Sequence, residues 1–216
     1  MATEPILIGM FDSPFVRRVA VSMKLLWVPF EHRSWSIGKD FELIRQFNPL
    51  GRVPTLVQPD GEALFESSAI LDYLDERVGP ERALMPRSGE PRREALRIIA
   101  AAIGAAEKGV SQVYESAFRP PEKRYRPWVE RCHTQMHAAL AQLDRACQAR
   151  SGEWLVGRGL SQADITATCV YTFLSDALGL NRDGVAYAGL GALAERCEAM
   201  VEFRSVRAEW FAPTDS

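Results

Sequence analysis

The chain has 216 residues, enough for one large or two small domains that bury a core without covalent cross-links. Its 26 basic and 28 acidic residues give a formal net charge of -2, which offers no basis for binding nucleic acid. No apolar run is long enough to span a bilayer and the N-terminus lacks a signal-peptide pattern, so we expect a soluble cytoplasmic protein.

The first half of the chain contains no cysteine, so it has no thiol nucleophile of its own. The four cysteines lie in the second half, with neither a Cys-x-x-Cys redox pair nor a zinc-ligand spacing, and we expect them to be buried. They are Cys132, Cys147, Cys169 and Cys197. His133 and His137 have a spacing that can chelate metal, but no third ligand is evident nearby, and we predict no metal site.

The first predicted elements are a strand and a helix. The apolar segment 6–10 predicts a buried strand, and Pro14 follows it at a position typical of the first helical turn. Apolar residues then recur at helical spacing up to Leu26, which predicts a helix with Ser13 as its N-cap. On this local pattern alone, capping is the favoured role for Ser13, and a chemical role requires partners elsewhere.

The next predicted elements complete a sheet. Residues 30–35 predict a second strand, and apolar positions between 41 and 47 predict a short helix. Two strands are predicted at 55–57 and 63–65, around a Pro-Asp-Gly turn at 59–61, and a helix begins near Ser67. A right-handed crossover makes the first strand pair parallel and the closing hairpin is antiparallel, so we expect a mixed sheet.

The second half of the chain is predicted to be helical. Gly and Pro residues at 79–80 and 85–89 interrupt the pattern and predict a linker at 80–90. Two apolar stripes at helical spacing follow, one from Ile98 to Tyr114 and one from Val129 to Cys147, and both are interpreted as core-facing surfaces. The predicted domains are therefore residues 1–79 and 91–216.

Two further motifs lie in the first half, NPLGRVPTLV at 48–57 and LFESSAILDYL at 64–74. Together with Ser-Pro-Phe at 13–15, they resemble the glutathione transferase superfamily in order and spacing, most closely its serine-type members such as tau-class and bacterial relatives. The resemblance covers essentially the whole chain. It implies an α/β thioredoxin-like N-terminal domain with a mixed four-stranded sheet, followed by an all-α C-terminal domain.

The resemblance also implies roles for particular residues. Ser13 would hold the glutathione thiolate, and Val53 would pair with the glutathione backbone through a cis bond to Pro54, although Pro54 could also be an ordinary strand-starting proline. Glu66 and Ser67 would bind the charged groups of the γ-glutamyl end, and the structural alternative is that Ser67 is a helix N-cap with Glu66 beside it.

Other site residues are carried over from the resemblance in the same way. Lys39 and Arg52 are candidates for binding the glycyl carboxylate of glutathione. The candidates for an apolar electrophile pocket are Phe11, Phe15, Tyr114 and Trp210. The implied protein is a homodimeric, cytoplasmic detoxification enzyme that conjugates glutathione to small apolar electrophiles. A non-catalytic regulatory or binding protein on the same fold and a glutathione-dependent isomerase remain as alternatives.

Ser161 and Asp164 have the spacing of a capping box at the start of a helix, with Leu160 and Ile165 at the hydrophobic-staple positions. We predict that Asp164→Ala lowers the free energy of unfolding by roughly 0.5–2 kcal/mol because the cap is lost. Thermal and urea unfolding measure this change. An unaltered melting temperature in a folded variant would contradict the capping role.

Overall fold

The N-terminal part of the chain forms a four-stranded sheet in the computed structural model, which describes residues 4–180 and 187–212. The strand order is β2-β1-β3-β4. β1 (Ile6–Ile8) pairs in parallel with β2 (Glu31–Arg33) and antiparallel with β3 (Thr55–Val57), and β3 pairs antiparallel with β4 (Ala63–Phe65). The mixed four-stranded sheet predicted from the sequence is confirmed.

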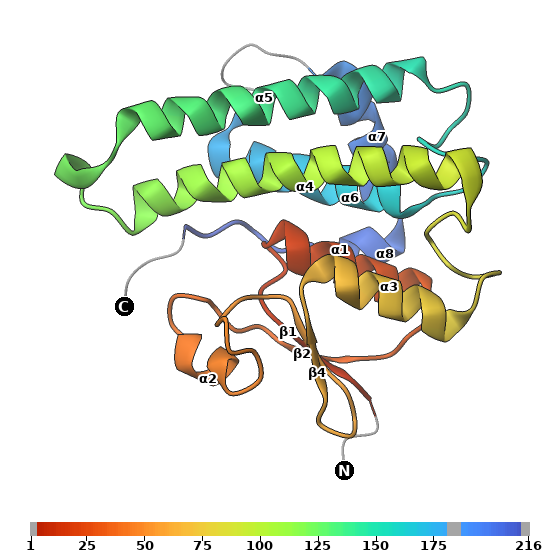
Figure 1. Ribbon diagram of the computed structural model, residues 1–216, viewed down its shortest axis with the longest axis horizontal. Helices are drawn as coiled ribbons and strands as arrows, with labels where there is room; N and C mark the ends of the chain where they lie inside the picture. The colour runs from red at the N-terminus through yellow and green to blue at the C-terminus, as the bar shows by residue number, and fades with distance from the viewer. Residues whose placement is uncertain (1–3, 181–186, 213–216) are drawn as a thin grey trace.

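Helices pack on both faces of this sheet. Successive strand residues point to opposite faces, so Leu7 and Leu56 join the core formed with α1 (Pro14–Leu25) and α3 (Ser67–Val78). Ile8 and its neighbours on the other face form a smaller cluster around α2 (Phe41–Arg45). In Figure 1, α1 and α3 lie between the sheet and the helical part of the molecule. The first helix is therefore buried from two sides.

The second half of the described chain is helical, as predicted. Its elements are α4 (Gly89–Ala117), the 3-10 turn η1 (Pro121–Lys123), α5 (Arg126–Ala149), α6 (Gln162–Leu178), α7 (Ala188–Glu198) and α8 (Val201–Arg204). The long helices α4 and α5 run side by side, and α6 packs against α4 and α1 (Figure 1). α4 begins inside the linker predicted at 80–90. Within residues 4–180 and 187–212, every helix is too short or too polar to traverse a membrane.

The two predicted apolar stripes largely face the core. Ile98 and Ala102 on α4 and Met136 and Leu140 on α5 are at most 2% exposed. Tyr114, at the end of the first stripe, differs because its side chain leaves the core and is 39% exposed. All four cysteines are buried and free of disulfides, as expected.

The predicted capping box at the start of α6 is confirmed. One oxygen of the buried Asp164 carboxylate accepts hydrogen bonds from the Ser161 N–H at 2.9 Å and the Ser161 hydroxyl at 2.8 Å. The other oxygen accepts from the N–H of Leu155 at 2.8 Å, so this carboxylate also holds the preceding loop. Three donors depend on one side chain, and the cost of Asp164→Ala should therefore reach the upper end of the predicted range.

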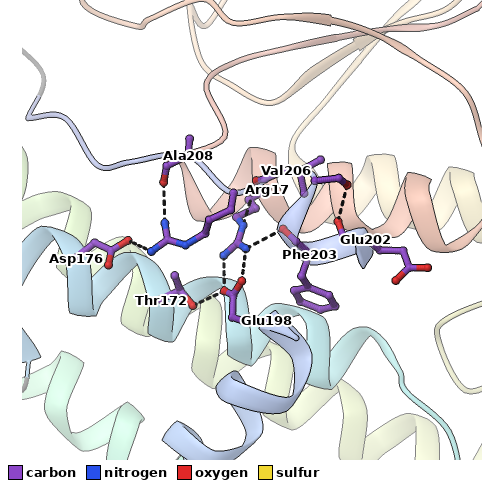
Figure 2. Close-up of polar contacts among 10 residues, drawn as sticks. Arg17, Thr172, Asp176, Glu198, Glu202, Phe203, Val206 and Ala208 are labelled. Carbon is purple, nitrogen blue, oxygen red and sulfur yellow. Dashed lines mark hydrogen bonds and ion pairs between the residues drawn. The ribbon is translucent and has the colours of Figure 1, made fainter. Parts of the chain in front are cut away.

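A buried ion pair joins the first helix to the C-terminal part of the chain (Figure 2). The guanidinium of Arg17 donates to both carboxylate oxygens of Glu198, at 2.7 and 2.6 Å. It also donates to the carbonyls of Phe203 at 3.1 Å and Val206 at 3.2 Å. Arg17 is only 2% exposed, and removing one partner of such a pair is typically strongly destabilising because the other charge stays buried.

The Arg17–Glu198 pair predicts an acid dependence of stability. Burial by itself would raise the pKa of Glu198, but hydrogen bonding and attraction from Arg17 outweigh it, and the pKa lies below its ordinary value of 4.5. A carboxyl with a lowered folded-state pKa contributes stability above its unfolded-state pKa. This contribution is lost as the pH falls through the folded-state pKa.

We expect the free energy of unfolding of the wild type to decrease more steeply below pH 4.5 than that of Glu198→Gln, because the glutamine does not titrate. The difference in stability between the two proteins should therefore shrink as the pH falls. Urea unfolding at several pH values measures it. Parallel pH profiles for the two proteins would contradict an ionised Glu198 in the folded state.

Candidate functional site

A cavity of about 920 Å³ lies between the sheet-containing part and the helical part of the molecule. Its wall includes the N-terminal end of α1, the segments 34–37, 39–41 and 50–53, residues of α4 and α6, and the end of the described chain at 210–212. The volume is within the range of small-molecule sites, which often form between domains. Residues far apart in sequence therefore converge on one space.

Ser13 lies on the wall of this cavity and is the N-cap of α1. Its Oγ accepts a hydrogen bond from the backbone N–H of Val16 at 3.4 Å, which confirms the capping prediction. A hydroxyl that accepts a hydrogen bond keeps its own hydrogen for another partner. Capping the helix and donating a hydrogen bond into the cavity are therefore compatible roles for one side chain.

Val53 lies beside this helix end because Gly9 allows a close approach. A Cβ on Gly9 would lie 2.8 Å from the Val53 Cβ and 2.6 Å from the Val16 side chain, and Gly9 has a φ of +128°. The Val53–Pro54 peptide bond is cis, so the question that the sequence left open is resolved. Among the described residues, neither the N–H nor the carbonyl of Val53 has a hydrogen-bond partner. Both groups can bind a ligand backbone.

The loop that carries Val53 is shaped by Asn48, a buried residue to which the sequence reading assigned no role. Its Nδ2 donates to the Arg52 carbonyl at 2.8 Å and to the Thr55 Oγ1 at 3.2 Å. Its Oδ1 accepts from the Leu50 N–H at 3.0 Å. A single amide side chain thus connects both ends of the loop.

Two cationic side chains, Lys39 and Arg52, line the cavity. The loop before Lys39 is ordered by the Asp40 carboxylate, which accepts from the Ser36 N–H at 2.8 Å. Burial raises the pKa of Tyr114, and the positive charge of Arg52 opposes that rise. Arg52 is therefore electrostatically coupled to a tyrosine from the helical part of the molecule.

Glu66 and Ser67 are not part of the cavity wall. Glu66 is the N-cap of α3 and has a φ of 75°, and its carboxylate accepts from the Ser68 N–H at 3.0 Å and the Ser67 hydroxyl at 3.3 Å. The N-cap of α3 is therefore Glu66, whereas the sequence pattern favoured Ser67 as the N-cap. Ser67 is 1% exposed and accepts a hydrogen bond from Arg18 at 3.4 Å. Pro54 is buried and likewise does not line the cavity.

A buried cation lies beneath this corner. Arg18 is 2% exposed, and burial lowers its pKa to about 10, while the negative charge of Glu66 opposes the change. Within residues 4–180 and 187–212, the Arg18 Nε has no hydrogen-bond partner. Arg18 therefore connects α1 to the start of α3.

The aromatic candidates divide between the cavity and the core. Phe15, Tyr114 and Trp210 line the cavity. Phe11 does not, because its ring stacks on His32 with the centroids 3.7 Å apart. Four further aromatic residues of the wall were not predicted from the sequence, and three of them lie in a loop or at a helix end without a periodic pattern. These are Trp35, Phe41, Phe118 and Phe173, and Phe211 lines the cavity beside Trp210.

Asp12 is a further wall residue that the sequence pattern did not single out. Burial raises the pKa of its carboxyl group, and hydrogen bonding from the backbone groups of Ser13, Asp12 and Phe211 opposes the rise. The carboxyl therefore lies between the start of α1 and the C-terminal segment.

The paired histidines are part of a local contact. The rings of His133 and His137 are 4.2 Å apart, and His137 Nδ1 lies 2.6 Å from the Tyr187 hydroxyl oxygen. In the part of the chain that the structure describes, no group of three or more His, Cys, Asp or Glu side chains could hold a metal ion.

The cysteine thiols are also poor candidates for chemistry. Burial raises the pKa of Cys147 and Cys197 to about 11 and that of Cys169 to about 12. A thiol with so high a pKa is almost entirely protonated at neutral pH and is a weak nucleophile. A reactive sulfur in the cavity would have to come from a ligand.

Residues 7–82 match the family model described as the N-terminal domain of glutathione S-transferase. In overall structure, the chain resembles a glutathione S-transferase from Methylobacterium radiotolerans that was solved in complex with glutathione sulfonate. The TM-score is 0.89 and the sequence identity 26%, over 99% of each chain.

Two curated proteins are similar in sequence. The uncharacterized GST-like protein YibF of Escherichia coli is 33% identical over 111 residues, and the match covers 51% of this chain and 54% of that protein. The chain thus matches about half the length of this relative. A probable maleylacetoacetate isomerase 2 of Drosophila melanogaster is 29% identical over 169 residues, with 74% of this chain and 70% of that protein covered.

Proposed function

Since the chain belongs to the glutathione transferase superfamily, we propose that it is a glutathione transferase that joins the glutathione thiolate to small apolar electrophiles. The observation that carries the proposal is the place of Ser13, on the wall of a large cavity at the N-terminus of α1. A detoxification role and a homodimeric assembly stay predictions from the resemblance.

In the proposed mechanism, Ser13 stabilises the thiolate without losing its own proton. The ordinary pKa of a thiol is about 8.5, and lowering it by two units requires roughly 2.7 kcal/mol. A charge-assisted hydrogen bond from the Ser13 hydroxyl would supply roughly 1.5–3 kcal/mol, and the helix dipole roughly 0.3–1 kcal/mol more. These two contributions are sufficient to make the thiolate the main form near neutral pH.

The rest of glutathione would extend along the cavity edge. The unpartnered N–H and carbonyl of Val53 suit the cysteinyl backbone, which they would bind in the manner of an added strand. Lys39 and Arg52 on the wall suit the glycyl carboxylate. Glu66 and Ser67 are proposed to anchor the γ-glutamyl end, where the dipole at the N-terminal end of α3 and the buried charge of Arg18 favour a carboxylate.

The electrophile would bind on the helical side of the cavity. Aromatic side chains from several elements line this side, among them Phe15, Tyr114 and Trp210. An apolar wall of this kind excludes water and favours apolar ligands.

The role of Ser13 is tested with Ser13→Ala and, as a control that keeps a hydroxyl, Ser13→Thr. We expect Ser13→Ala to raise the pKa of the bound glutathione thiol and to lower the conjugation rate by up to about 30-fold at pH 7, because only about 3% of a thiol with a pKa of about 8.5 is ionised there. The ultraviolet absorbance of the thiolate reports the pKa of the bound thiol, and the conjugation rate is measured with an aryl halide. Equal rates for wild type and Ser13→Ala would remove Ser13 from the mechanism. Failure of the wild type to bind millimolar glutathione in calorimetry would favour a non-catalytic protein.

A second candidate function, glutathione-dependent isomerisation, is supported by the similarity to the probable maleylacetoacetate isomerase. An isomerase regenerates glutathione after the double bond has rotated, whereas a conjugating enzyme consumes it. We expect conjugation of an aryl halide with loss of free thiol. Rapid cis–trans conversion of a maleyl compound at constant free thiol would instead identify the protein as an isomerase.

A further inference from the structure

The last described residues of the chain form a segment, 205–212, that we call the C-terminal strap. It follows α8 and runs back toward the N-terminal end of α1 (Figure 1). Trp210, Phe211 and Ala212, at its end, line the cavity. The position of the strap therefore determines the shape of one wall of the cavity.

The base of the strap is attached to α1 by Arg17. The guanidinium that pairs with Glu198 also donates to the carbonyls of Phe203 and Val206, as Figure 2 shows. Val206 is itself 1% exposed and belongs to the main core. The beginning of the strap is thus held by buried contacts.

The middle of the strap is attached to α6 by a second ion pair. Arg207 donates to the carboxylate of Asp176 at 2.6 Å, and its other terminal nitrogen donates to the Ala208 carbonyl at 2.6 Å (Figure 2). These two side chains are 38% and 30% exposed, so the pair is accessible to water. An ion pair at such a site contributes little to global stability, which makes it suitable for mutation.

The Arg207–Asp176 pair lies beside the aromatic wall. Phe173 is one turn before Asp176 on α6, so both side chains lie on the same helix face. The ring of Trp210 meets Phe173 edge to face, with the centroids 5.4 Å apart. Only about 10 Å³ of space remains among Asp12, Phe173, Asp176, Arg207 and Trp210, room for roughly one water molecule.

We propose that Arg207 and Asp176 are positioning residues for the electrophile half of the cavity, which act by holding Trp210 against Phe173. This role rests on the proposed glutathione transferase function. The ion pair joins the strap to α6 one helical turn from the aromatic contact, so its loss would let the wall move while α1 and Ser13 stay in place. The pair would therefore determine electrophile binding and leave glutathione binding unchanged.

The proposal is tested with Arg207→Asp, Asp176→Arg and the double variant in which the charges are exchanged. The matched control is Arg97→Asp, which breaks the exposed Arg97–Glu94 pair on α4, whose N–O distance is 2.7 Å. In each single strap variant, we expect the KM for an aryl halide to rise about five-fold while the KM for glutathione and the pKa of its bound thiol stay unchanged. The double variant should return the KM for the aryl halide to within about two-fold of wild type.

Two measurements do not depend on catalysis. Calorimetry compares glutathione with S-hexylglutathione, whose alkyl chain would lie in the electrophile half, and only S-hexylglutathione should bind more weakly to the single variants. Hydrogen exchange of the strap should become faster in the single variants and slow again in the double variant.

The possible outcomes separate the two proposals. The positioning role would be overturned if the single variants kept the wild-type ratio of affinities for S-hexylglutathione and glutathione. It would also be overturned if the double variant did not recover the KM for the aryl halide. An equal effect of Arg97→Asp on electrophile binding would also overturn it. If the wild-type protein bound neither glutathione nor S-hexylglutathione, that result would overturn the proposed function itself.

Discussion

Two successive buried arginines hold α1 in place, Arg17 against the C-terminal half of the molecule and Arg18 against α3, and the site depends on their different directions. Neighbouring residues on a helix point about 100° apart. Arg17 therefore reaches Glu198 and the carbonyls that precede the strap, while Arg18 reaches Ser67 at the start of α3. The N-terminal end of α1, with Ser13, is thereby fixed relative to α3 and to the C-terminal half of the molecule. A buried guanidinium tolerates little displacement, because leaving its partner exposes an unpaired charge to an apolar interior.

This arrangement separates two tasks within one cavity. Groups suited to glutathione come from the N-terminal part, where Gly9 and Asn48 bring the Val53 loop beside Ser13. The aromatic wall comes mainly from the helical part and the strap. The hydrogen bonds of Arg17 and Arg18, which hold the helix that begins after Ser13, do not involve the Arg207–Asp176 pair. We therefore expect a change in the strap to alter the proposed electrophile half without disturbing the proposed thiolate site at Ser13.

The predictions that were confirmed rest on short-range rules. The β3–β4 hairpin follows from a Pro-Asp-Gly turn between two apolar triplets, and the cap of α6 follows from the spacing of Ser161 and Asp164. Two aromatic side chains point in directions that the sequence pattern did not indicate. Phe11 is an aromatic residue two positions before Ser13, yet it stacks on His32. Tyr114 continues an apolar helical stripe, yet it leaves the core at the end of that stripe.

By itself, the sequence determined the order of the elements, the mixed sheet, the caps of α1 and α6 and the segments from which the site is built. These features depend on residues close together along the chain, whose spacing reflects local geometry. Only the tertiary structure decided that Arg17 and Arg18 are buried, that Asn48 shapes the Val53 loop and that Trp210 reaches the cavity. Each of these depends on a partner brought close by packing, and the energy of burying a polar or aromatic group is set by that partner rather than by its neighbours in sequence.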